Sequence, residues 1–420
     1  MVYIKRAMED VILRANQTFK AILITGARQT GKSTILQQMF PDRKMITFDD
    51  SYLESQARNN PDMFMQLNAP PITIDEVQYV PELFRYIKMA CDETNERGLF
   101  SLSGSQPLLL MKSVSESLSG RVCILEMLTL SLREIQGDSF AQPFLPTMEY
   151  LLERQKTVRK PENIWEIIHR GCYPELYQTP EMDWQAFYGS YVKTYLERDV
   201  RSLSAVQDLD TFRRFMVAVA ARTGQLLNYS NIADEISRDV GTVKNWMSIL
   251  EASGIIYLLE PYTPAVLKRA IKTPKVYFRD TGLASYLTRW LTTETLAYGA
   301  MNGAMFETYV VSEILKSYAN RNIDYRYCVS YYRGKDKTRK KVDGVTVEEK
   351  SEIDLIIEEN GILYPLEIKK NTSESASATG AFTVLDKIPE KKRGMGALIS
   401  LCPQPGKLRE NVLEIPVWHI

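Results

Sequence analysis

The sequence has little histidine and cysteine, no excess of either charge, and no long apolar run. Only two histidines, His169 and His419, occur among 420 residues, which argues against zinc held by histidines and against a Ser-His-Asp triad. The five cysteines are scattered and odd in number, and they show neither a disulfide framework nor the CxxC spacing of zinc sites. This usage favours a reducing cytoplasm. Mostly carboxylates, lysines and bound metal remain for catalysis.

The charge balance and the apolar pattern exclude two further classes of protein. Lysine plus arginine and aspartate plus glutamate each number 52, so a polybasic chain that coats nucleic acid is excluded, although a local basic face is not. No apolar run approaches the roughly 18–20 residues that cross a bilayer. Residues 1–14 lack the apolar core of a signal peptide. We therefore expect no membrane partner.

The chain divides into three blocks. Residues 1–140 alternate short apolar runs with helix-like segments, which predicts βαβ units and a parallel sheet with helices on both faces. Residues 145–300 read as mostly helical, and residues 301–420 combine a helix with several strand-like segments. At roughly 150 residues per domain, a multidomain α/β chain is expected.

The strongest motif lies near the N-terminus. It fits G-x-x-x-x-G-K-[ST] in full and stands between an apolar strand and a helix, as a phosphate-binding loop requires. Glycines allow the tight turn, backbone N–H groups and the helix N-terminus attract an anion, the lysine meets the β- and γ-phosphates, and the serine ligates Mg²⁺. The predicted nucleotide-binding residues are Gly26, Ala27, Arg28, Gln29, Thr30, Gly31, Lys32, Ser33 and Thr34.

Two acids end a second apolar run, at residues 71–76. Parallel strands place ligand-binding residues at their carboxyl ends. We expect Asp75 to hold Mg²⁺, directly or through a water molecule, and Glu76 to orient and polarise the attacking water. ATP and Mg²⁺ are the predicted cofactors.

Two more positions complete the predicted ATP site. A third strand leads into a Ser-Gly-Ser turn, where Ser105 is the first and Ser103 the second candidate to contact the γ-phosphate or the water. Arg121 is the nearest candidate in sequence for the arginine that stabilises the transition state, and Arg198 is a weaker one. Either arginine can instead pair with surface carboxylates.

The middle block contains the layout of a winged helix, at about residues 213–265. Ser230 or Asn231 is expected to cap one helix and Thr242 a second, whose apolar residues follow the spacing of one buried face: Val243, Trp246, Met247 and Leu250. The solvent face of the second helix offers three candidate DNA contacts, Lys244, Asn245 and Ser248, but its charge is weak for a DNA reader. Packing or subunit contact is the alternative role.

Acids and a lysine in the last block suggest a metal-dependent site. Glu367 and Lys369 alternate on one strand face, Asp354 lies on a neighbouring strand, and Glu307 or Glu313 comes from a helix. Oxygen ligands suit Mg²⁺, and a lysine beside it could position a water for phosphodiester attack. Solvated charge at strand ends is the alternative. A basic loop at residues 333–341 could contact a phosphate backbone or form a solvated hairpin tip.

In combination these motifs resemble a known family. They include residues 24–33, 74–78, 102–106 and 119–121, then 195–199, 275–283 and the acids between 303 and 369. The chain is similar, over nearly its whole length, to bacterial and archaeal AAA+-like (STAND-related) ATPases that carry a C-terminal domain of unknown function. The resemblance implies a P-loop ATPase domain, a winged helix, and a terminal domain similar to the PD-(D/E)xK nuclease fold. Asp354, Glu367 and Lys369 match that superfamily's acid, acid and lysine positions.

Three functions follow as hypotheses. The first is a Mg²⁺-dependent ATPase that couples ATP binding and hydrolysis to its winged-helix and nuclease-like parts, with DNA as a candidate partner. The second is an ATP-gated DNA nuclease. The third is a non-enzymatic nucleotide switch that regulates a protein interaction. The sequence leaves the oligomeric state, and an arginine acting between subunits, open.

Overall fold

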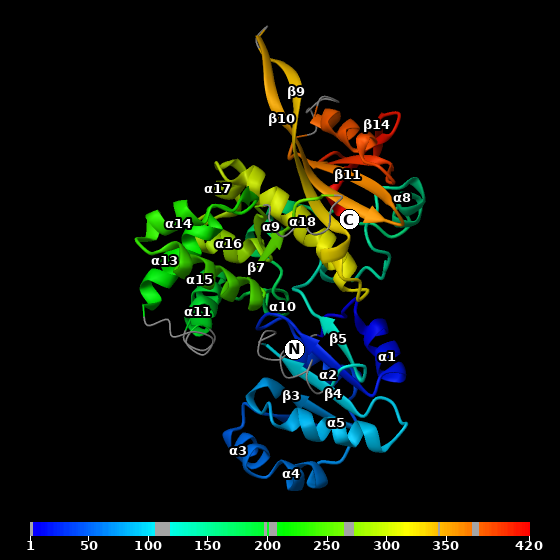
Figure 1. Cartoon of the computed structure of the whole chain (residues 1–420), viewed down its shortest axis with the longest axis vertical. Coiled ribbons are helices and arrows are strands. Elements are labelled where there is room, and N and C mark those ends of the chain that lie inside the picture. The colour runs from blue at the N-terminus through cyan, green and yellow to red at the C-terminus, as the bar shows by residue number, and fades with distance from the viewer. Residues whose placement is uncertain are drawn as a thin grey trace.

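The computed structural model describes residues 3–105, 118–196, 200, 208–263, 273–342, 345–371 and 378–420, with residues 335–342 and 345–350 described by backbone alone. Figure 1 shows an N-terminal body in blue and cyan, a helical body in green, and a sheet in orange and red from which a long hairpin projects. No helix in these ranges has the length and apolar character to cross a bilayer.

The N-terminal body is a five-stranded parallel sheet in the order β2-β3-β4-β1-β5. Alternate side chains of β1 enter opposite cores, with Leu23 on one face and Ile22 and Ile24 on the other. Helices therefore cover both faces, as the sequence predicts. The elements are α1 (Glu9–Thr18), β1 (Ala21–Thr25), α2 (Lys32–Met39), β2 (Lys44–Thr47), α3 (Ser51–Asn59), α4 (Pro61–Leu67), β3 (Ile72–Asp75), η1 (Val77–Tyr79), α5 (Leu83–Glu93), β4 (Phe100–Gly104) and β5 (Val122–Glu126).

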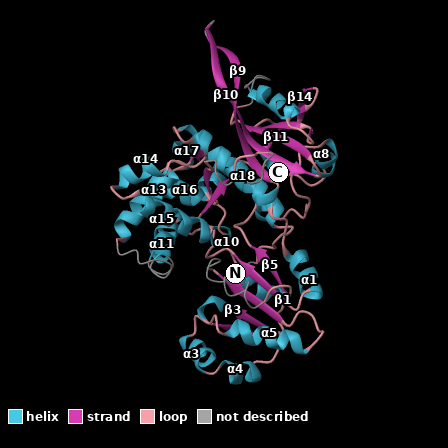
Figure 2. Cartoon of the chain, viewed as in Figure 1, coloured by secondary structure: helices cyan, strands magenta, loops and turns pink. Residues whose placement is uncertain are grey.

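The middle of the chain is mostly helical and carries a small antiparallel sheet in the order β6-β8-β7. Figure 2 separates this helix-rich body from the two larger sheets. Its elements are α7 (Leu132–Ile135), α8 (Met148–Arg154), α9 (Ile164–Arg170), α10 (Pro174–Gln178), α11 (Trp184–Tyr195), α13 (Leu209–Ala220), β6 (Gln225–Leu226), α14 (Tyr229–Ile236), α15 (Val240–Ala252), β7 (Ile256–Leu259), β8 (Lys275–Phe278), α16 (Thr281–Leu287) and α17 (Thr293–Tyr298).

Both helix caps predicted in this region are wrong by a few residues. The cap of α14 is Asn228, whose side chain accepts a hydrogen bond from the Asn231 amide. The cap of α15 is Asp239, whose Oδ1 accepts from the Thr242 amide at 2.8 Å. Asn, Asp, Ser and Thr all cap well, so composition alone does not choose between neighbours. The apolar face of α15 is buried as predicted.

The last block forms a mixed sheet in the order β14-β15-β13-β11-β10-β9, with β12 beside β11. The β9, β10 and β11 strands are antiparallel, whereas β11, β13 and β15 are parallel. Residues 333–341, predicted as a loop, belong to β9, because the β9–β10 pairing continues to Val342 and Val345. The elements are α18 (Asn302–Ala319), η4 (Tyr325–Tyr327), β9 (Val329–Val342), β10 (Val345–Glu359), β11 (Ile362–Ile368), η5 (Ala378–Lys387), β12 (Lys392–Arg393), β13 (Gly396–Ser400), β14 (Gly406–Arg409), β15 (Val412–Pro416) and η6 (Val417–His419).

The middle and last blocks share one apolar core, which runs from Leu128 to Ile420. The segment after β5 crosses between them: the Phe144 amide donates to Ser317 Oγ at 3.0 Å, and the Tyr150 hydroxyl donates to the His419 carbonyl at 2.9 Å. Accordingly α8 lies beside the C-terminal sheet in Figure 1. This segment ties the N-terminal body to the rest of the molecule.

Candidate functional site

The G-x-x-x-x-G-K-S segment turns sharply between β1 and α2. Gly26 has a φ of 143°, and a Cβ there would lie 2.2 Å from the Met127 carbonyl oxygen, so only glycine fits. Gly31, with a φ of 92°, stands at the N-terminus of α2. Lys32 is buried, and its Nζ donates to the carbonyls of Gly26 at 3.1 Å and Ala27 at 2.7 Å. The ammonium group therefore lies against the loop where the motif predicts it.

Asp75, at the end of β3, is hydrogen-bonded both to the loop motif and to the neighbouring strand β4. Its Oδ1 accepts hydrogen bonds from Ser33 Oγ at 2.8 Å and from Ser103 Oγ. Burial raises the pKa of Asp75, and the two hydroxyl hydrogen bonds oppose that rise. The structure thus places the two predicted Mg²⁺ ligands, Ser33 and Asp75, in direct contact. Ser103 donates its hydroxyl hydrogen bond to Asp75.

Glu76 follows in the left-handed region, with a φ of 53°. One carboxylate oxygen accepts from Ser105 Oγ at 2.7 Å and the other from Gln78 Nε2. Burial favours a higher pKa for Glu76, but these hydrogen bonds and the charge of Lys32 outweigh it and lower the pKa. Glu76 therefore stays ionised at neutral pH. Gln78 belongs to a motif that the sequence shows, yet sequence reasoning gives it no role.

Two adjoining cavities open beside the loop. The first, of about 380 Å³, is lined by Lys32, Ser33, Glu76 and Ser105 on one side and by Tyr191 and Thr194 of α11 on the other. The second, of about 480 Å³, shares Gln29, Gly31 and Thr34 with the first. Its apolar lining comes from the N-terminal segment, the chain before α7, and the region of α10 and α11: Tyr3, Ile4, Leu130, Pro174, Met182 and Phe187.

Arg121 lies away from these cavities. It precedes β5, and β5 runs parallel to β1, so Arg121 is at the sheet edge opposite the phosphate loop. Its guanidinium group pairs with Asp92 at 2.5 Å. Within its own chain, Arg121 therefore lies away from the phosphate loop, in the kind of carboxylate pair that the sequence leaves open as its alternative role. Arg198 lies outside the described residues.

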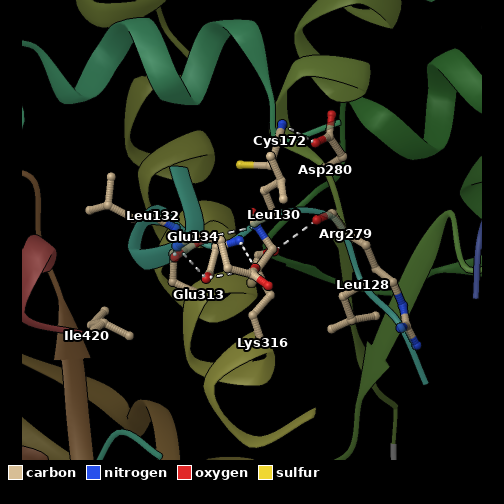
Figure 3. Close-up of polar contacts among 12 residues, drawn as sticks. Leu128, Leu130, Leu132, Glu134, Cys172, Arg279, Asp280, Glu313, Lys316 and Ile420 are labelled. Atoms are coloured by element: carbon tan, nitrogen blue, oxygen red, sulfur yellow. Dashed lines mark hydrogen bonds and ion pairs between the residues drawn. The ribbon is translucent and has the colours of Figure 1, made fainter. Parts of the chain in front are cut away.

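A strap formed by residues 128–132 links the loop to the last block. Arg6 donates to the carbonyls of Thr30 in the loop and Leu128 in the strap, at 2.7 and 2.8 Å. On the other side, Lys316 donates to the Leu130 carbonyl at 2.8 Å and Glu313 accepts from the Leu132 amide at 2.8 Å. Figure 3 shows Glu313 and Lys316 of α18 directed at the strap.

Glu313 is thus not part of the acidic site of the last block. Its carboxylate is buried against Lys316 at 2.8 Å. Glu307 stands six residues earlier, which is about 240° around the helix, and faces the sheet strands instead. The sequence leaves open whether Glu307 or Glu313 belongs to the acidic site. In the structure it is Glu307 that lies beside the other acids of this site.

Asp354, Glu367 and Lys369 lie close together around β10 and β11. Lys369 Nζ lies 2.8 Å from Glu367 and 3.6 Å from Asp354, and the Ile368 amide donates to Asp354 Oδ2 at 2.9 Å. Glu307 Oε1 accepts from the Tyr277 hydroxyl at 2.5 Å. Burial, then repulsion from Asp354, raises the pKa of Glu307 to about 7 and that of Glu367 to about 8.

A second lysine, which sequence reasoning missed, enters this site from β8. Lys275 Nζ lies 2.9 Å from Glu352, 3.5 Å from Glu307 and 3.7 Å from Asp354. Within the part of the chain that the structure describes, no group of three histidine, cysteine or acidic side chains is placed to hold a metal ion. Nothing in the local sequence of Lys275 signals this contact, because its partners are more than 30 residues away.

The three candidate DNA contacts lie together on α15. Lys244, Asn245 and Ser248 are all exposed. The Lys244 ammonium lies 5.6 Å from the centre of the Tyr229 ring. After the same helix, Gly254 lies against Ala27 of the phosphate loop, so that a Cβ on Gly254 would meet Ala27 at 3.4 Å.

Family comparisons agree with the geometry of the first block. Residues 18–136 match the AAA domain family, and residues 161–294 and 302–418 match two domains of unknown function, DUF8612 and DUF4143. The phosphate loop, the parallel sheet and the paired acids of the first block are the features of an AAA-type P-loop ATPase domain, the family that this block matches.

Relatives and solved structures extend the comparison. An uncharacterised protein of Mycobacterium tuberculosis is 26% identical over 374 residues, 89% of this chain and 75% of that protein. One from Methanocaldococcus jannaschii is 22% identical over 319 residues, 70% of this chain and 66% of that protein. A Walker-type ATPase of Pyrococcus abyssi has a TM-score of 0.42 at 13% identity, covering 67% of this chain and 94% of its own. A STAND protein of Pyrococcus horikoshii has a TM-score of 0.24 at 12% identity, covering 76% and 47%. Neither structural similarity bears on function.

Proposed function

We propose that the chain binds Mg-ATP at the Gly26–Ser33 loop and hydrolyses it to ADP and phosphate. The contact of Ser33 with Asp75 carries this proposal, because it brings the hydroxyl of the loop and the acid of β3 to one point at 2.8 Å. A P-loop ATPase holds Mg²⁺ with these two residue types. Their oxygens suit a hard cation.

Each residue of the site has a distinct task in this proposal. Lys32 neutralises charge on the β- and γ-phosphates, and Ser33 and Asp75 would hold Mg²⁺, which when bound offsets further phosphate charge. Glu76 orients the attacking water and accepts hydrogen bonding from it. Ser105 positions the Glu76 carboxylate through its 2.7 Å hydrogen bond. The apolar cavity beside the loop receives the base.

We further propose three functional units, 1–140, 145–300 and 301–420. The order α13, β6, α14, α15, β7, β8 with an antiparallel sheet supports a winged helix, and exposed Lys244, Asn245 and Ser248 would be its DNA contacts. A helix followed by antiparallel β9, β10 and β11 and parallel β13 supports the nuclease-like fold.

The central test compares nucleotide binding and turnover in the wild type and in Lys32→Ala. Lys32→Ala should weaken Mg-ATP binding or slow phosphate release by at least about 100-fold, because the loop loses its cation. The matched control is Lys88→Ala, a lysine of α5 in the same block, which should behave like the wild type. If calorimetry on folded wild-type protein detected no heat with ATP or with GTP, the proposal would fail.

The gathering of Glu307, Asp354, Glu367 and Lys369 favours an ATP-gated nuclease as a second candidate. Its test is Mg²⁺- or Mn²⁺-dependent nicking of plasmid or single-stranded DNA, with Glu367→Ala as the inactive control. The absence of nicking in all conditions would exclude it. ATP binding without turnover, even with DNA present, would instead favour a nucleotide switch.

A further inference from the structure

Lys275 occupies an unusual position for a lysine. It lies at the start of β8, in the middle block, but its ammonium group is buried among acids of the last block, and the residue is only 3% exposed. Three carboxylates surround it: Glu352 at 2.9 Å, Glu307 at 3.5 Å and Asp354 at 3.7 Å. A buried ammonium requires such compensation.

The acids of this site suit a divalent cation by their residue type, although no three of them, all within the described part of the chain, are placed to hold one in this conformation. The four carboxylates Glu307, Glu352, Asp354 and Glu367 supply the oxygen ligands that Mg²⁺ and Mn²⁺ prefer. Glu367 is 8% exposed, and its Oε2 has no hydrogen-bond partner among the residues described. Two lysine ammonium groups, those of Lys275 and Lys369, lie among these four carboxyl groups.

The position of Lys275 nevertheless conflicts with a bound metal. A cation held by these four carboxylates would lie about 2–2.6 Å from their oxygens, and the Lys275 ammonium already lies within 3.7 Å of three of them, those of Glu307, Glu352 and Asp354. Two positive centres so close repel strongly in a buried site. The ammonium and the metal are therefore alternatives.

Backbone contacts fix the strand that presents Lys275. The Gly224 amide donates to the Val276 carbonyl at 2.7 Å, and Ser312 Oγ of α18 donates to the Arg279 carbonyl at 2.8 Å. The chain after β7 also pairs with β9, where the Tyr262 amide donates to the Tyr331 carbonyl at 2.6 Å. The lysine thus approaches the acids on a strand that is held at both ends.

We propose that Lys275 is a built-in counter-ion that takes the place of a divalent cation. It closes the acidic site to metal in this conformation and fastens the small β6-β8-β7 sheet to the C-terminal block. The proposal rests on the nuclease-like arrangement of the acids and is independent of ATP hydrolysis.

The test is a Mn²⁺ titration of the full-length, nucleotide-free chain, followed by electron paramagnetic resonance. An Asp75→Asn background removes the cation site at the phosphate loop. In this background the protein should bind no Mn²⁺ at millimolar concentration, whereas adding Lys275→Met should create one Mn²⁺ site that Glu367→Gln abolishes. Two results would overturn the proposal: Mn²⁺ binding that depends on Glu367 while Lys275 is present, or no binding to a folded Lys275→Met protein.

Two controls separate charge from simple loss of a side chain. Lys275→Arg keeps the positive charge and should bind no Mn²⁺. Lys370→Met removes a lysine that bonds to the Ala297 carbonyl, outside the cluster, and should also bind none. Mn²⁺ should raise the melting temperature of the protein that carries Lys275→Met but not that of the Asp75→Asn protein from which it is made. If Lys275→Met did not fold, the Mn²⁺ titration of the Asp75→Asn protein would still test the proposal. Mn²⁺ binding that Glu367→Gln removes would contradict the proposal, and the absence of such binding would support it.

Discussion

The two acidic sites of this molecule differ in what stabilises their carboxylates. At the phosphate loop, Asp75 and Glu76 accept hydrogen bonds from neutral donors, namely serine hydroxyls and one glutamine amide. In the last block, Asp354 and Glu367 lie beside lysine ammonium groups. Burial does not account for this difference between the two sites, since Asp75 is 7% exposed and Asp354 and Glu367 are each 8% exposed. We infer that carboxylates with neutral donors keep their negative charge available for a cation, whereas carboxylates beside lysine ammonium groups do not.

The largest effect should come from removing an ammonium that balances a fully buried acid. Lys316→Met leaves Glu313 buried without its ion pair, which should lower the free energy of unfolding by about 3–5 kcal/mol. Urea unfolding measures the change. The double variant Glu313→Leu with Lys316→Met should recover part of the loss. A loss under about 1 kcal/mol in Lys316→Met would show that ammonium groups are not what stabilises acids in this block.

The next effect tests the site with neutral donors. Glu76→Gln should keep Mg-ATP affinity but slow turnover about 100-fold, because the amide cannot accept a proton from water. Phosphate release and nucleotide binding, measured separately, distinguish the two effects. Glu82→Gln, at an exposed position before α5, is the matched control and should be fully active. Unchanged phosphate release in Glu76→Gln would remove Glu76 from the catalytic role.

The two sites should also differ in their dependence on pH. Glu307 and Glu367 have folded pKa values of about 7 and about 8, above the ordinary 4.5. The folded state therefore binds their protons more tightly than the unfolded state. The contribution of these two groups to the free energy of unfolding is full below pH 4.5 and is lost as the pH rises toward 8. Urea unfolding between pH 5 and pH 9 should show this decline, and Glu367→Gln should reduce it. Identical curves for both proteins would contradict the assignment.

The smallest effect is expected at Arg121. Its exposed pair with Asp92 lies at the sheet edge opposite the loop, so Arg121→Ala should change turnover by less than about twofold. Steady-state phosphate release checks this. A loss of about tenfold or more that depends on protein concentration would mean that Arg121 completes the site of a neighbouring copy.

The phosphate loop was predictable because the residues that form it are adjacent in the sequence. A strand, a turn and a helix N-terminus lie within about a dozen residues, and Asp75 and Glu76 end one apolar run. Sequence also predicted the parallel sheet and the buried face of α15. It could not tell which end of β5 carries Arg121, because sequence proximity does not show where a strand begins.

The acidic site was less accessible to sequence reasoning. Choosing Glu307 over Glu313 requires the rotational phase of α18, which is set by packing on both sides of that helix. Lys275 reaches Asp354 only because β8 and β10 meet in the fold. The basic residues after Arg333 were predicted as a loop because polar strands that project from a body lack the usual alternation of apolar residues.

The strap of residues 128–132 has a mechanical consequence. Arg6 is hydrogen-bonded to the strap beside the nucleotide loop, and side chains of α18 are hydrogen-bonded to it two to four residues later. Hydrogen bonds at both ends of this short connection thereby couple the parallel sheet to the long α18 helix. Any movement driven by the nucleotide would then arise on the opposite wall of the cavities, which residues of α10 and α11 line.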